Sequence, residues 1–438
     1  MKTYLFWVQL LLAVPFSLLA QTKQDSVLQE ATLAQCIKYA LQHQPVIQQS
    51  LLDESITEKT IQSKLADWYP QINFGYNYQH NFQLPAAYFS GNYVRTGTGN
   101  SSNLGFGLNQ NIFNRDVLLA SRTASDIRKQ VKQNATFNKI DLAANVSKAF
   151  YDVLLTQKQV EVLDQAITRL ERNLRDSYHQ YQAGIVDKTD YKRASISLNN
   201  TKAQRKQVAD LIVAKLSYLR QLMGYPDTAS LKLNYDTAMI EKEAWVDTAA
   251  TVQFENRIEY QQLKTQQRLQ AANLNYYKWN FLPTLSAFGN YNMSYLNDAF
   301  SKLYNQTFAN SNLGLQLSIP IFQGNKRVYQ VKQAELQLKR VDWDIIALRS
   351  KIYTQYEQAL AIYKGYYANY ISLRDNVALA DDVFKTIQLQ YNSGIKTYLD
   401  VIVAESDLRT AQLNYYNALY ELLQSKIDIQ KALGNIQY

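Results

Sequence analysis

The chain has 438 residues, a formal net charge of +9, 33 tyrosines and only 14 glycines and 7 prolines. Its basic residues are spread along the sequence without a lysine or arginine block. Nucleic-acid binding requires basic side chains gathered on one face, so the composition argues against a nucleic-acid partner. The length would accommodate about two or three globular domains.

Residues 1–20 have the pattern of a secretory signal peptide. Lys2 precedes an apolar stretch from Leu5 to Leu19, and Ala20-Gln21 is a suitable cleavage point. This stretch is shorter than the roughly 20 residues that a membrane-spanning helix needs. We therefore expect the mature chain to leave the cytoplasm, and an uncleaved N-terminal anchor is the alternative.

Cys36 is the only cysteine, so the chain forms no internal disulfide. A lipid anchor on this thiol is disfavoured because Gln35 occupies the place where lipidation signals carry a small residue. We expect Cys36 to be a partly buried thiol on a helix.

An internal duplication determines the expected domain organisation. The tetrapeptide "SNLG" occurs at 102–105 and again at 311–314. Two glycine pairs are each 210 residues apart, namely Gly184 with Gly394 and Gly224 with Gly434. Ordered matches at a near-constant offset indicate two copies of one structural unit. We expect a signal peptide at 1–20, a first repeat at 21–230, a linker at 231–250 and a second repeat at 251–438.

Each repeat contains two segments in which apolar and polar residues alternate, as in a strand with one apolar and one polar face. Phe288 is an exception, because it falls among the polar positions. The segments have 10 to 12 residues, close to the length of about 9–11 that a tilted membrane strand requires. They lie at 71–82, 103–112, 284–295 and 312–321.

Two very long helical segments follow these strands. From Arg115 to Gln182 the sequence has 68 residues without proline or glycine and with apolar residues at helical spacing. An unbroken helix of this length would span about 100 Å. Return helices follow, so we predict helical hairpins at 115–223 and 325–433. Helices of this length indicate coiled-coil packing.

The strands need a surface to cover their apolar face, and the sequence offers no second sheet. A lipid-facing apolar side with a water-facing amide side explains the pattern. Four strands cannot close a barrel and open strand edges are not tolerated in hydrocarbon, so several chains must each contribute strands. The predicted fold is mainly α with a membrane β-barrel part. The lipid-facing positions are expected to be Ile72, Phe74, Tyr76, Tyr78, Leu313, Leu315 and Leu317.

From Ala31 to Asn435 the sequence resembles the TolC-like outer-membrane efflux channels of Gram-negative bacteria. The resemblance rests on the duplication, on "SIPIFQGNKRVYQVKQAELQL" from Ser318, and on the reversals "YQAGIVDKTDYKRASISL" and "YNSGIKTYLDVIVAESDL". It implies a homotrimer with a barrel in the outer membrane and a helical tunnel in the periplasm. It also implies a periplasmic adaptor and an inner-membrane pump, proton-driven or ATP-driven, as partners.

The resemblance further implies that the two reversals are the periplasmic tips of the tunnel and its gate. Asp190 and Asp400 would form rings of inward carboxylates, and Tyr391 with Lys396 would link neighbouring hairpins. A second acid of the family's ring is Val403 here, so one ring is missing. The adaptor-contact tips would be Ala183, Gly184, Ile185, Ser393, Gly394 and Ile395.

A simpler interpretation of the reversals needs no gate. A glycine ends long helices well because it adopts positive φ, which accounts for Gly184 and Gly394. Asp190 and Asp400 lie in the first turn of the return helices, where a carboxylate caps the helix and meets its positive dipole end. Capping alone remains an alternative explanation for both acids.

The sequence predicts no enzyme, no cofactor and no metal. Its three histidines, His43, His80 and His179, are far apart and not at ligand spacing, and no phosphate-binding loop or nucleophile elbow is present. We expect an outer-membrane exit channel of a tripartite efflux system. The alternatives are the outer-membrane channel of type I protein secretion and a pore-free coiled-coil scaffold in the periplasm.

Overall fold

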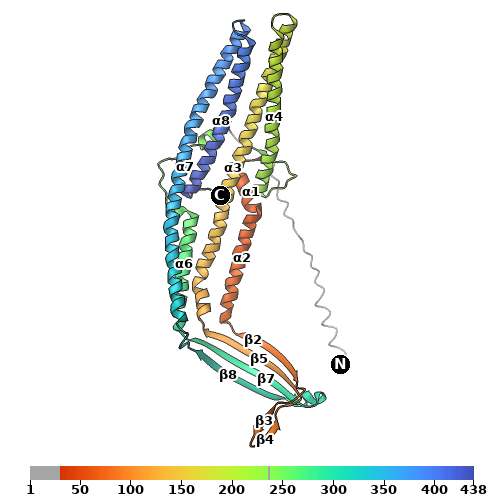
Figure 1. The fold of residues 1–438 in the computed structure, drawn as a ribbon, viewed down its shortest axis with the longest axis vertical. Helices are drawn as coiled ribbons and strands as arrows, with labels where there is room; N and C mark the ends of the chain where they lie inside the picture. Colours follow the sequence, from red (N-terminus) through yellow and green to blue (C-terminus); the bar gives the residue numbers. More distant parts are fainter. Residues whose placement is uncertain (1–29, 235–236) are drawn as a thin grey trace.

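The computed structural model describes residues 30–234 and 237–438, so the signal peptide expected at 1–20 lies outside the described residues. Figure 1 shows an elongated molecule in which long paired helices form one end and a curved sheet forms the other. Within the described ranges, no helix combines the length and the apolar character needed to cross a membrane.

The elements alternate between helices and strands in both halves of the chain. The first half contains α1 (Leu33–His43), α2 (Pro45–Leu65), β2 (Gln71–His80), β3 (Ala86–Phe89), β4 (Asn92–Arg95), β5 (Asn100–Phe113), α3 (Arg115–Gln182) and α4 (Lys188–Met223). The second contains α5 (Thr237–Glu243), α6 (Ile258–Lys278), β7 (Thr284–Asn297), β8 (Phe308–Ser318), α7 (Lys326–Asn392) and α8 (Tyr398–Leu433). Two-residue strands β1 (Glu30–Ala31) and β6 (Lys232–Leu233) pair in parallel.

The four long strands form one antiparallel sheet in the order β2-β5-β7-β8. The strands of the two repeats therefore meet at the β5–β7 pair in the middle of the sheet. Its outer strands, β2 and β8, each have one side without a strand partner among the described residues. The sheet is thus open at both edges within one chain.

All four strands differ from the expected ranges at one or both ends. β2 ends at His80, β5 spans Asn100–Phe113, β7 extends to Asn297 and β8 begins at Phe308. β8 ends at Ser318 and not at Ile321, because Pro320 has no N–H to donate to the sheet. The segment between β2 and β5 contains the hairpin β3–β4. Tyr88 pairs with Tyr93 in this hairpin, and their rings lie 5.1 Å apart, a contact that the alternation pattern did not reveal.

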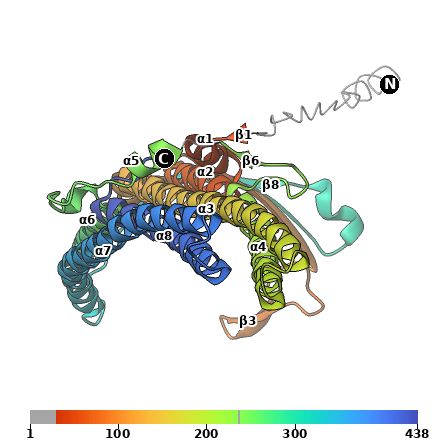
Figure 2. The same cartoon turned by 90° about the horizontal axis from the view of Figure 1, so that it is seen from above.

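The long helices run without a break. α3 has 68 residues and α7 has 67, and α7 continues through Gly365, where an added Cβ would have open space. Near the sheet the helices pack in the order α2, α3, α6, α7, and at the other end in the order α4, α3, α8, α7. The long helices therefore form a curved wall, with α1 and α5 on its convex side (Figure 2).

The apolar core lies at the middle of the helical part, where α1, α3, α4, α7 and α8 come together. Fully buried leucines from three helices meet there, among them Leu154, Leu219 and Leu423. Cys36 is buried on α1 in the same cluster, and burial raises the pKa of its thiol to about 12. It is therefore a protonated packing residue.

Tyrosine hydroxyls hold the segment 244–250, part of the expected linker, against the helices. The hydroxyl of Tyr363 donates to the carbonyl of Ala244 and accepts from the N–H of Val246, both at 3.0 Å. Tyr356 donates to the carbonyl of Ala250 at 2.6 Å. These bonds satisfy backbone groups that would otherwise be buried unpaired. They give several of the 33 tyrosines a structural role.

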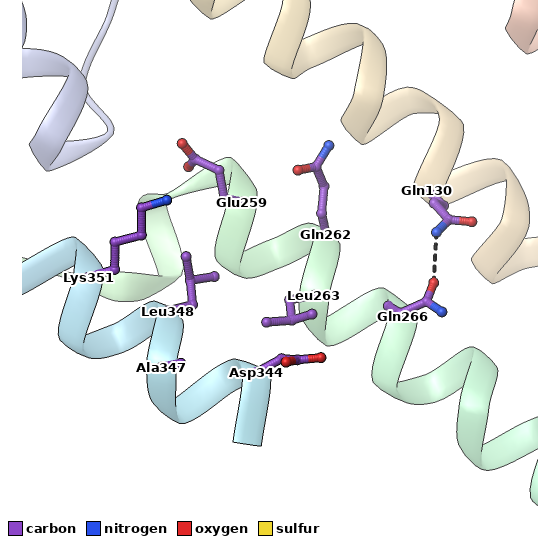
Figure 3. A pocket seen from close by; sticks show the side chains of 9 residues that line it. All are labelled: Gln130, Glu259, Gln262, Leu263, Gln266, Asp344, Ala347, Leu348 and Lys351. Atoms are coloured by element: carbon purple, nitrogen blue, oxygen red, sulfur yellow. Dashed lines mark hydrogen bonds between the residues drawn. The ribbon is translucent and has the colours of Figure 1, made fainter. Parts of the chain in front are cut away.

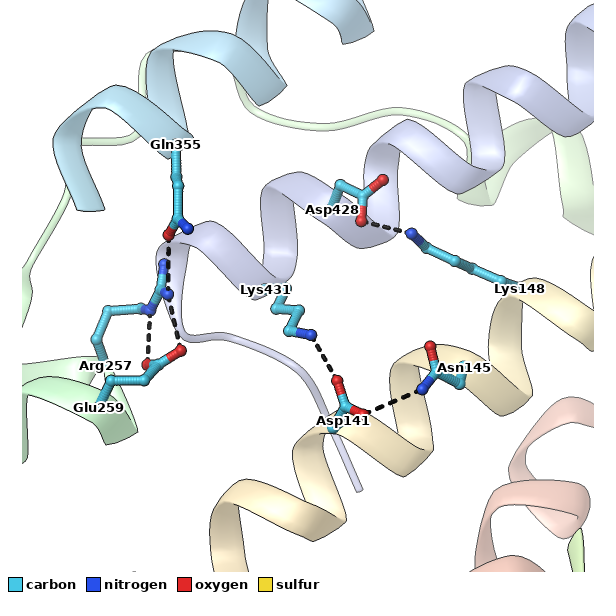
Figure 4. A network of polar contacts seen from close by, with 8 residues as sticks. All are labelled: Asp141, Asn145, Lys148, Arg257, Glu259, Gln355, Asp428 and Lys431. Carbon is cyan, nitrogen blue, oxygen red and sulfur yellow. Dashed lines mark hydrogen bonds and ion pairs between the residues drawn. The ribbon is translucent and has the colours of Figure 1, made fainter. Parts of the chain in front are cut away.

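Charged side chains connect the helices beside this core (Figure 4). Lys431 on α8 pairs with Asp141 on α3 at 2.7 Å, and Lys148 on α3 pairs with Asp428 on α8 at 2.5 Å. These two pairs cross between the same helices in opposite directions. They fix the register of α3 against α8, which joins the two repeats.

A second part of this network lies at the start of α6. The buried guanidinium of Arg257 binds Glu259 at 2.9 Å and donates to the carbonyl of Ala432 at 3.0 Å. Burial acts to raise the pKa of Glu259, but the hydrogen bonds and charge of Arg257, a backbone N–H and the charge of Lys431 together lower it. Arg257 thereby anchors the end of α8 to the start of α6.

Candidate functional site

The sheet has one apolar face that no described part of the chain covers along most of its length. Phe74 pairs with Phe106, which pairs with Tyr291, so apolar positions continue from strand to strand. The expected lipid-facing residues lie on this face with exposed fractions of 73% (Ile72), 57% (Phe74), 55% (Tyr76), 39% (Tyr78), 82% (Leu313), 69% (Leu315) and 59% (Leu317). A contiguous apolar surface of this kind marks an interface with lipid or protein.

The opposite face of the sheet is lined by amides. Asn290 donates to Asn312 at 3.0 Å, and Asn292 donates to Asn310 at 3.2 Å, across the β7–β8 pair. Ser294 donates to Oδ1 of Asn103. Hydrogen-bonded amides remain compatible with water, so this face is suited to an aqueous boundary.

Aromatic side chains gather at the end of the apolar face that lies away from the helices. The 3₁₀ segment η5 (Phe300–Asn305) folds onto it. The hydroxyl of Tyr304 lies 3.1 Å from that of Tyr76, and the rings of Phe300 and Tyr78 are 5.6 Å apart. Tyrosines with an apolar body and a polar tip are typical of a boundary between apolar and aqueous surroundings.

The two helical hairpins reverse through the same backbone geometry at the opposite end of the molecule. In the first, the N–H of Ile185 donates to the carbonyl of Gln180 at 2.9 Å and the N–H of Gly184 donates to that of Tyr181 at 3.0 Å. Gly184 has φ +75°, as this type of helix end requires. The second reversal repeats these bonds from Ile395 to Gln390 and from Gly394 to Tyr391, both at 2.9 Å.

Both reversals expose an isoleucine. In this type of helix end the residue after the glycine usually packs on the helix. Ile185 and Ile395 instead have exposed fractions of 72% and 73%, and Ala183 and Ser393 beside them are also exposed. The predicted tip residues of the two repeats therefore lie at equivalent, open positions.

The two predicted gate acids make different local contacts. Asp400 accepts from the N–H and the hydroxyl of Thr397 at 2.9 and 2.8 Å, which caps α8. These bonds lower the pKa of Asp400, and the nearby charge of Lys396 acts in the same direction. At α4 the capping acid is Asp187, which accepts from the N–H of Thr189 at 2.7 Å. Capping thus accounts fully for the contacts of Asp400 within the chain, and at α4 the side-chain cap is not Asp190.

Tyr391 links the two hairpins of the chain, but through a partner that the sequence did not indicate. Its hydroxyl donates to Oε1 of Gln180, at the end of α3, at 2.8 Å. Lys396, the expected partner, is exposed and lies beside Asp400. Glutamine is common along these helices, so Gln180 had no distinguishing signal in the sequence.

A buried charge cluster between the hairpins was also not evident from the sequence. Glu405 on α8 is fully buried and accepts from Arg169 on α3 at 3.3 Å and from Arg409 at 3.2 Å. Arg409 also donates to the hydroxyl of Thr201 on α4 at 2.7 Å. Burial raises the pKa of Glu405 even though both guanidinium groups act to lower it. The cluster joins three helices of the two repeats.

A cavity of about 470 Å³ opens between α3, α6 and α7 nearer the sheet (Figure 3). It is lined mainly by amides, carboxylates and aliphatic side chains, and Gln130 donates to Gln266 across it at 3.0 Å. The lining offers no pairing of a nucleophile with a base. In the described ranges, no group of three or more His, Cys, Asp or Glu side chains is placed to hold a metal ion.

Comparison with known proteins assigns this architecture. The family described as "Outer membrane efflux protein" matches residues 36–225 and 252–435, one range on each side of the expected linker. The outer membrane protein TolC of Escherichia coli is 22% identical over 431 residues, covering 94% of this chain and 84% of TolC. The alkaline protease secretion protein AprF of Pseudomonas aeruginosa is 23% identical over 308 residues, covering 68% of this chain and 61% of AprF.

Solved structures share the fold. The outer membrane protein VceC of Vibrio cholerae superposes with a TM-score of 0.72 at 14% identity, covering 92% of this chain and 96% of VceC. The outer membrane channel MtrE of Neisseria gonorrhoeae, in its open state, gives a TM-score of 0.71 at 16% identity, covering 92% and 89%. The α-helical tunnel part and the β part are therefore those of TolC-like channels.

These findings assign the chain to a family of outer-membrane channels. The chain is an efflux channel protein of the outer membrane and not an enzyme. With both repeats matched, it belongs to the outer membrane efflux protein family.

Proposed function

We propose that three copies of the chain form a passive exit channel of a tripartite efflux system. Four strands from each copy complete a β-barrel in the outer membrane, and the helices complete a tunnel in the periplasm. An inner-membrane pump, proton-driven or ATP-driven, and a periplasmic adaptor deliver substrates to the tips. The channel itself supplies no energy.

The observation that carries this proposal is the pair of open edges in each chain. Among residues 30–234 and 237–438, β2 and β8 each have one edge without a strand partner, and unpaired backbone groups are not tolerated in hydrocarbon. Pairing β2 of one copy with β8 of the next satisfies both edges at once. A closed ring of identical copies is the arrangement in which every edge is paired.

The helices at the same edges carry matching apolar stripes. On α7, Tyr329, Leu336 and Trp343 recur every seven residues with exposed fractions of 69%, 57% and 70%. α2 exposes Leu52 and Ile56, each 61% accessible. Seven-residue spacing of apolar side chains is typical of a coiled-coil seam. It supports packing of α7 against the opposite edge of a neighbouring copy.

The reversals are suited to the gate and to the adaptor contact. Exposed Ile185 and Ile395 give each copy two apolar contact points for a helical partner. Three copies of Asp190 and of Asp400 around a narrow axis would repel one another and favour cations. The Tyr391–Gln180 bond opposes that repulsion by holding the hairpins of each copy together, and Lys396 is available to a neighbouring copy.

Protein secretion remains the second candidate for the cargo. The relative AprF is named as an alkaline protease secretion protein, whereas TtgI of Pseudomonas putida is named as the outer membrane protein of a toluene efflux pump. The same channel would serve either cargo, because the inner-membrane pump selects the cargo. Membership of a channel family removes the support for a pore-free scaffold.

Purification from outer membranes tests the assembly. The wild-type chain should extract only with detergent, run as a trimer and form ion-conducting pores in planar bilayers. Trp343→Glu places a charge in the proposed seam and should yield monomers. Trp245→Glu is the matched control, because Trp245 is 66% exposed but lies in the linker. A wild-type protein that is monomeric and soluble without detergent would refute the proposal.

A further inference from the structure

We propose that a cavity between the two helical hairpins binds a small organic anion with an apolar body. The cavity has a volume of about 340 Å³ and lies between α4 and α8, near the reversals. This volume falls within the range of about 300–1,000 Å³ that is typical of small-molecule sites. The inference rests on the proposed channel only for the position of the cavity on the tunnel wall.

The lining combines two arginines with short polar and aliphatic side chains, contributed equally by the two hairpins. From α4 these include Arg193, Ile196 and Ser197, and from α8 they include Ile402, Ser406 and Arg409. Among the described residues, no carboxylate lines the cavity. Two cations without a lining acid favour an anion, and the isoleucines favour an apolar body on that anion.

Arg409 is held in position before any ligand binds. Its side chain is only 14% exposed, and it donates to Glu405 at 3.2 Å, to the hydroxyl of Thr201 at 2.7 Å and to that of Ser406 at 3.3 Å. A guanidinium has five N–H groups, so these three bonds leave donors for a ligand. A guanidinium that is already fixed loses little side-chain entropy when it binds a carboxylate or a sulfonate.

The buried charge cluster beside the cavity contains more positive than negative charge. Arg169 and Arg409 share the single carboxylate of Glu405, so two cations meet one anion. An anion in the cavity would supply the missing negative charge at short range. This attraction is stronger than between fully solvated charges, because partly buried groups are screened less by water and salt.

Arg193 supplies the second cation from the first hairpin. It is exposed, and within residues 30–234 and 237–438 it has no ion-pair partner. Its planar guanidinium can therefore bind a carboxylate through two hydrogen bonds without breaking an existing pair. The expected gate acids Asp190 and Asp400 lie on the same two helices but do not line the cavity.

The two arginines belong to different hairpins, so a ligand that contacts both joins α4 to α8. Figure 2 shows these two helices on the concave side of the wall, opposite α1 and α5. In the proposed channel the concave side faces the tunnel, and the ligand enters the cavity from there. Because the site needs both hairpins, its ligand stabilises the arrangement in which they lie together.

Ligand-observed NMR titration of the detergent-solubilised full-length protein tests this inference, with naphthoate as the probe. Naphthamide has the same ring system without the charge and should bind about tenfold more weakly, because it loses a charge-assisted hydrogen bond. Arg193→Gln should weaken naphthoate binding by about tenfold for the same reason. Ile196→Asn should weaken the binding of both probes, since Ile196 is 61% exposed and free to contact the rings.

Lys192→Gln provides the matched control. Lys192 is an exposed cation beside Arg193 on α4 but does not line the cavity, so this variant should bind naphthoate like the wild type. Unchanged affinity in Arg193→Gln would overturn the inference, as would equal losses in the Arg193 and Lys192 variants or equal affinities for naphthoate and naphthamide.

This binding assay is independent of pore formation. A protein that binds naphthoate in the expected manner but forms no pores would refute the proposed function and support the anion site. A protein that forms pores but binds naphthoate no better than naphthamide would support the proposed function and overturn the anion site.

Discussion

The hydroxyl of Tyr391 donates a hydrogen bond of 2.8 Å to Oε1 of Gln180, a residue 211 positions earlier in the chain. The bond joins the ends of the two helical hairpins. Burial raises the pKa of Tyr391, so the phenol keeps its proton and remains a donor at physiological pH. This bond connects the two repeats at the tips, where both hairpins are most exposed.

Tyr391→Phe should loosen the tips because it removes this bond and little else. We expect a higher single-channel conductance or longer open periods in planar bilayers. Gln180→Ala should have the same effect, and the double variant should add little to either single change, since both remove one interaction. Wild-type gating in both single variants would show that the bond does not restrain the tips.

Asp400→Asn separates capping from the field of a carboxylate ring. Asparagine still accepts hydrogen bonds at this helix start, but it carries no charge. The depressed pKa of Asp400 means that the carboxylate is charged at neutral pH, and its contribution to stability is lost only as the pH falls below its usual range.

We therefore expect the Asp190→Asn, Asp400→Asn double variant to lose cation preference in reversal-potential measurements while its thermal stability stays close to that of the wild type. Asp187→Asn, which changes a capping acid of α4, should keep the preference. An unchanged reversal potential in the double variant would show that Asp190 and Asp400 act only within their own helix starts and form no charged ring.

Arg169→Gln should destabilise the protein in a pH-dependent manner. It removes the ion pair of Glu405 with α3 and leaves a buried carboxylate with the guanidinium of Arg409, a change that costs about 3 kcal/mol in comparable buried pairs. The pKa of Glu405 is already raised by burial and should rise further in the variant.

The direction of this pH dependence follows from proton binding to Glu405. Below the pKa that Glu405 has in the unfolded chain, its carboxyl group is neutral in both the folded and the unfolded state. The variant should therefore lose the least stability near pH 4. As the pH rises toward 8 the folded variant resists ionisation, and the loss should grow. Thermal unfolding across this range measures it. Arg172→Gln is the control, because Arg172 is 79% exposed and pairs with Asp176 at 3.9 Å, so it should cost less than about 1 kcal/mol at any pH.

Tyr363→Phe should weaken the attachment of the linker. The change leaves the buried carbonyl of Ala244 and the N–H of Val246 without their shared partner, which costs about 2 kcal/mol. We expect a lower unfolding temperature and faster proteolysis within 244–250. Tyr353→Phe, at a position 56% exposed on the same helix, should change neither. Equal stability of the two variants would contradict the clamping role.

Local pattern in the sequence determined much of the fold. Alternation at 71–82 and at 312–321 predicted strands, and the absence of proline and glycine from Arg115 to Gln182 predicted the full extent of α3. The positions of these strands and the extent of α3 depend on residues that are neighbours in the sequence, so they can be predicted from the sequence alone. The reversal glycines Gly184 and Gly394 were evident for the same reason, because a positive φ favours one residue type.

Only the tertiary structure decided the contacts between different helices and strands. Gln180 resembles many exposed glutamines, and Glu405 resembles any helical acid until α3 buries it beside Arg169. Phe288 seemed misplaced among amides until β8 brought Gly314 beneath its ring. The reason is physical. Each of these roles depends on a partner in another helix or strand, and a side chain's own neighbours in sequence do not indicate what packs against it.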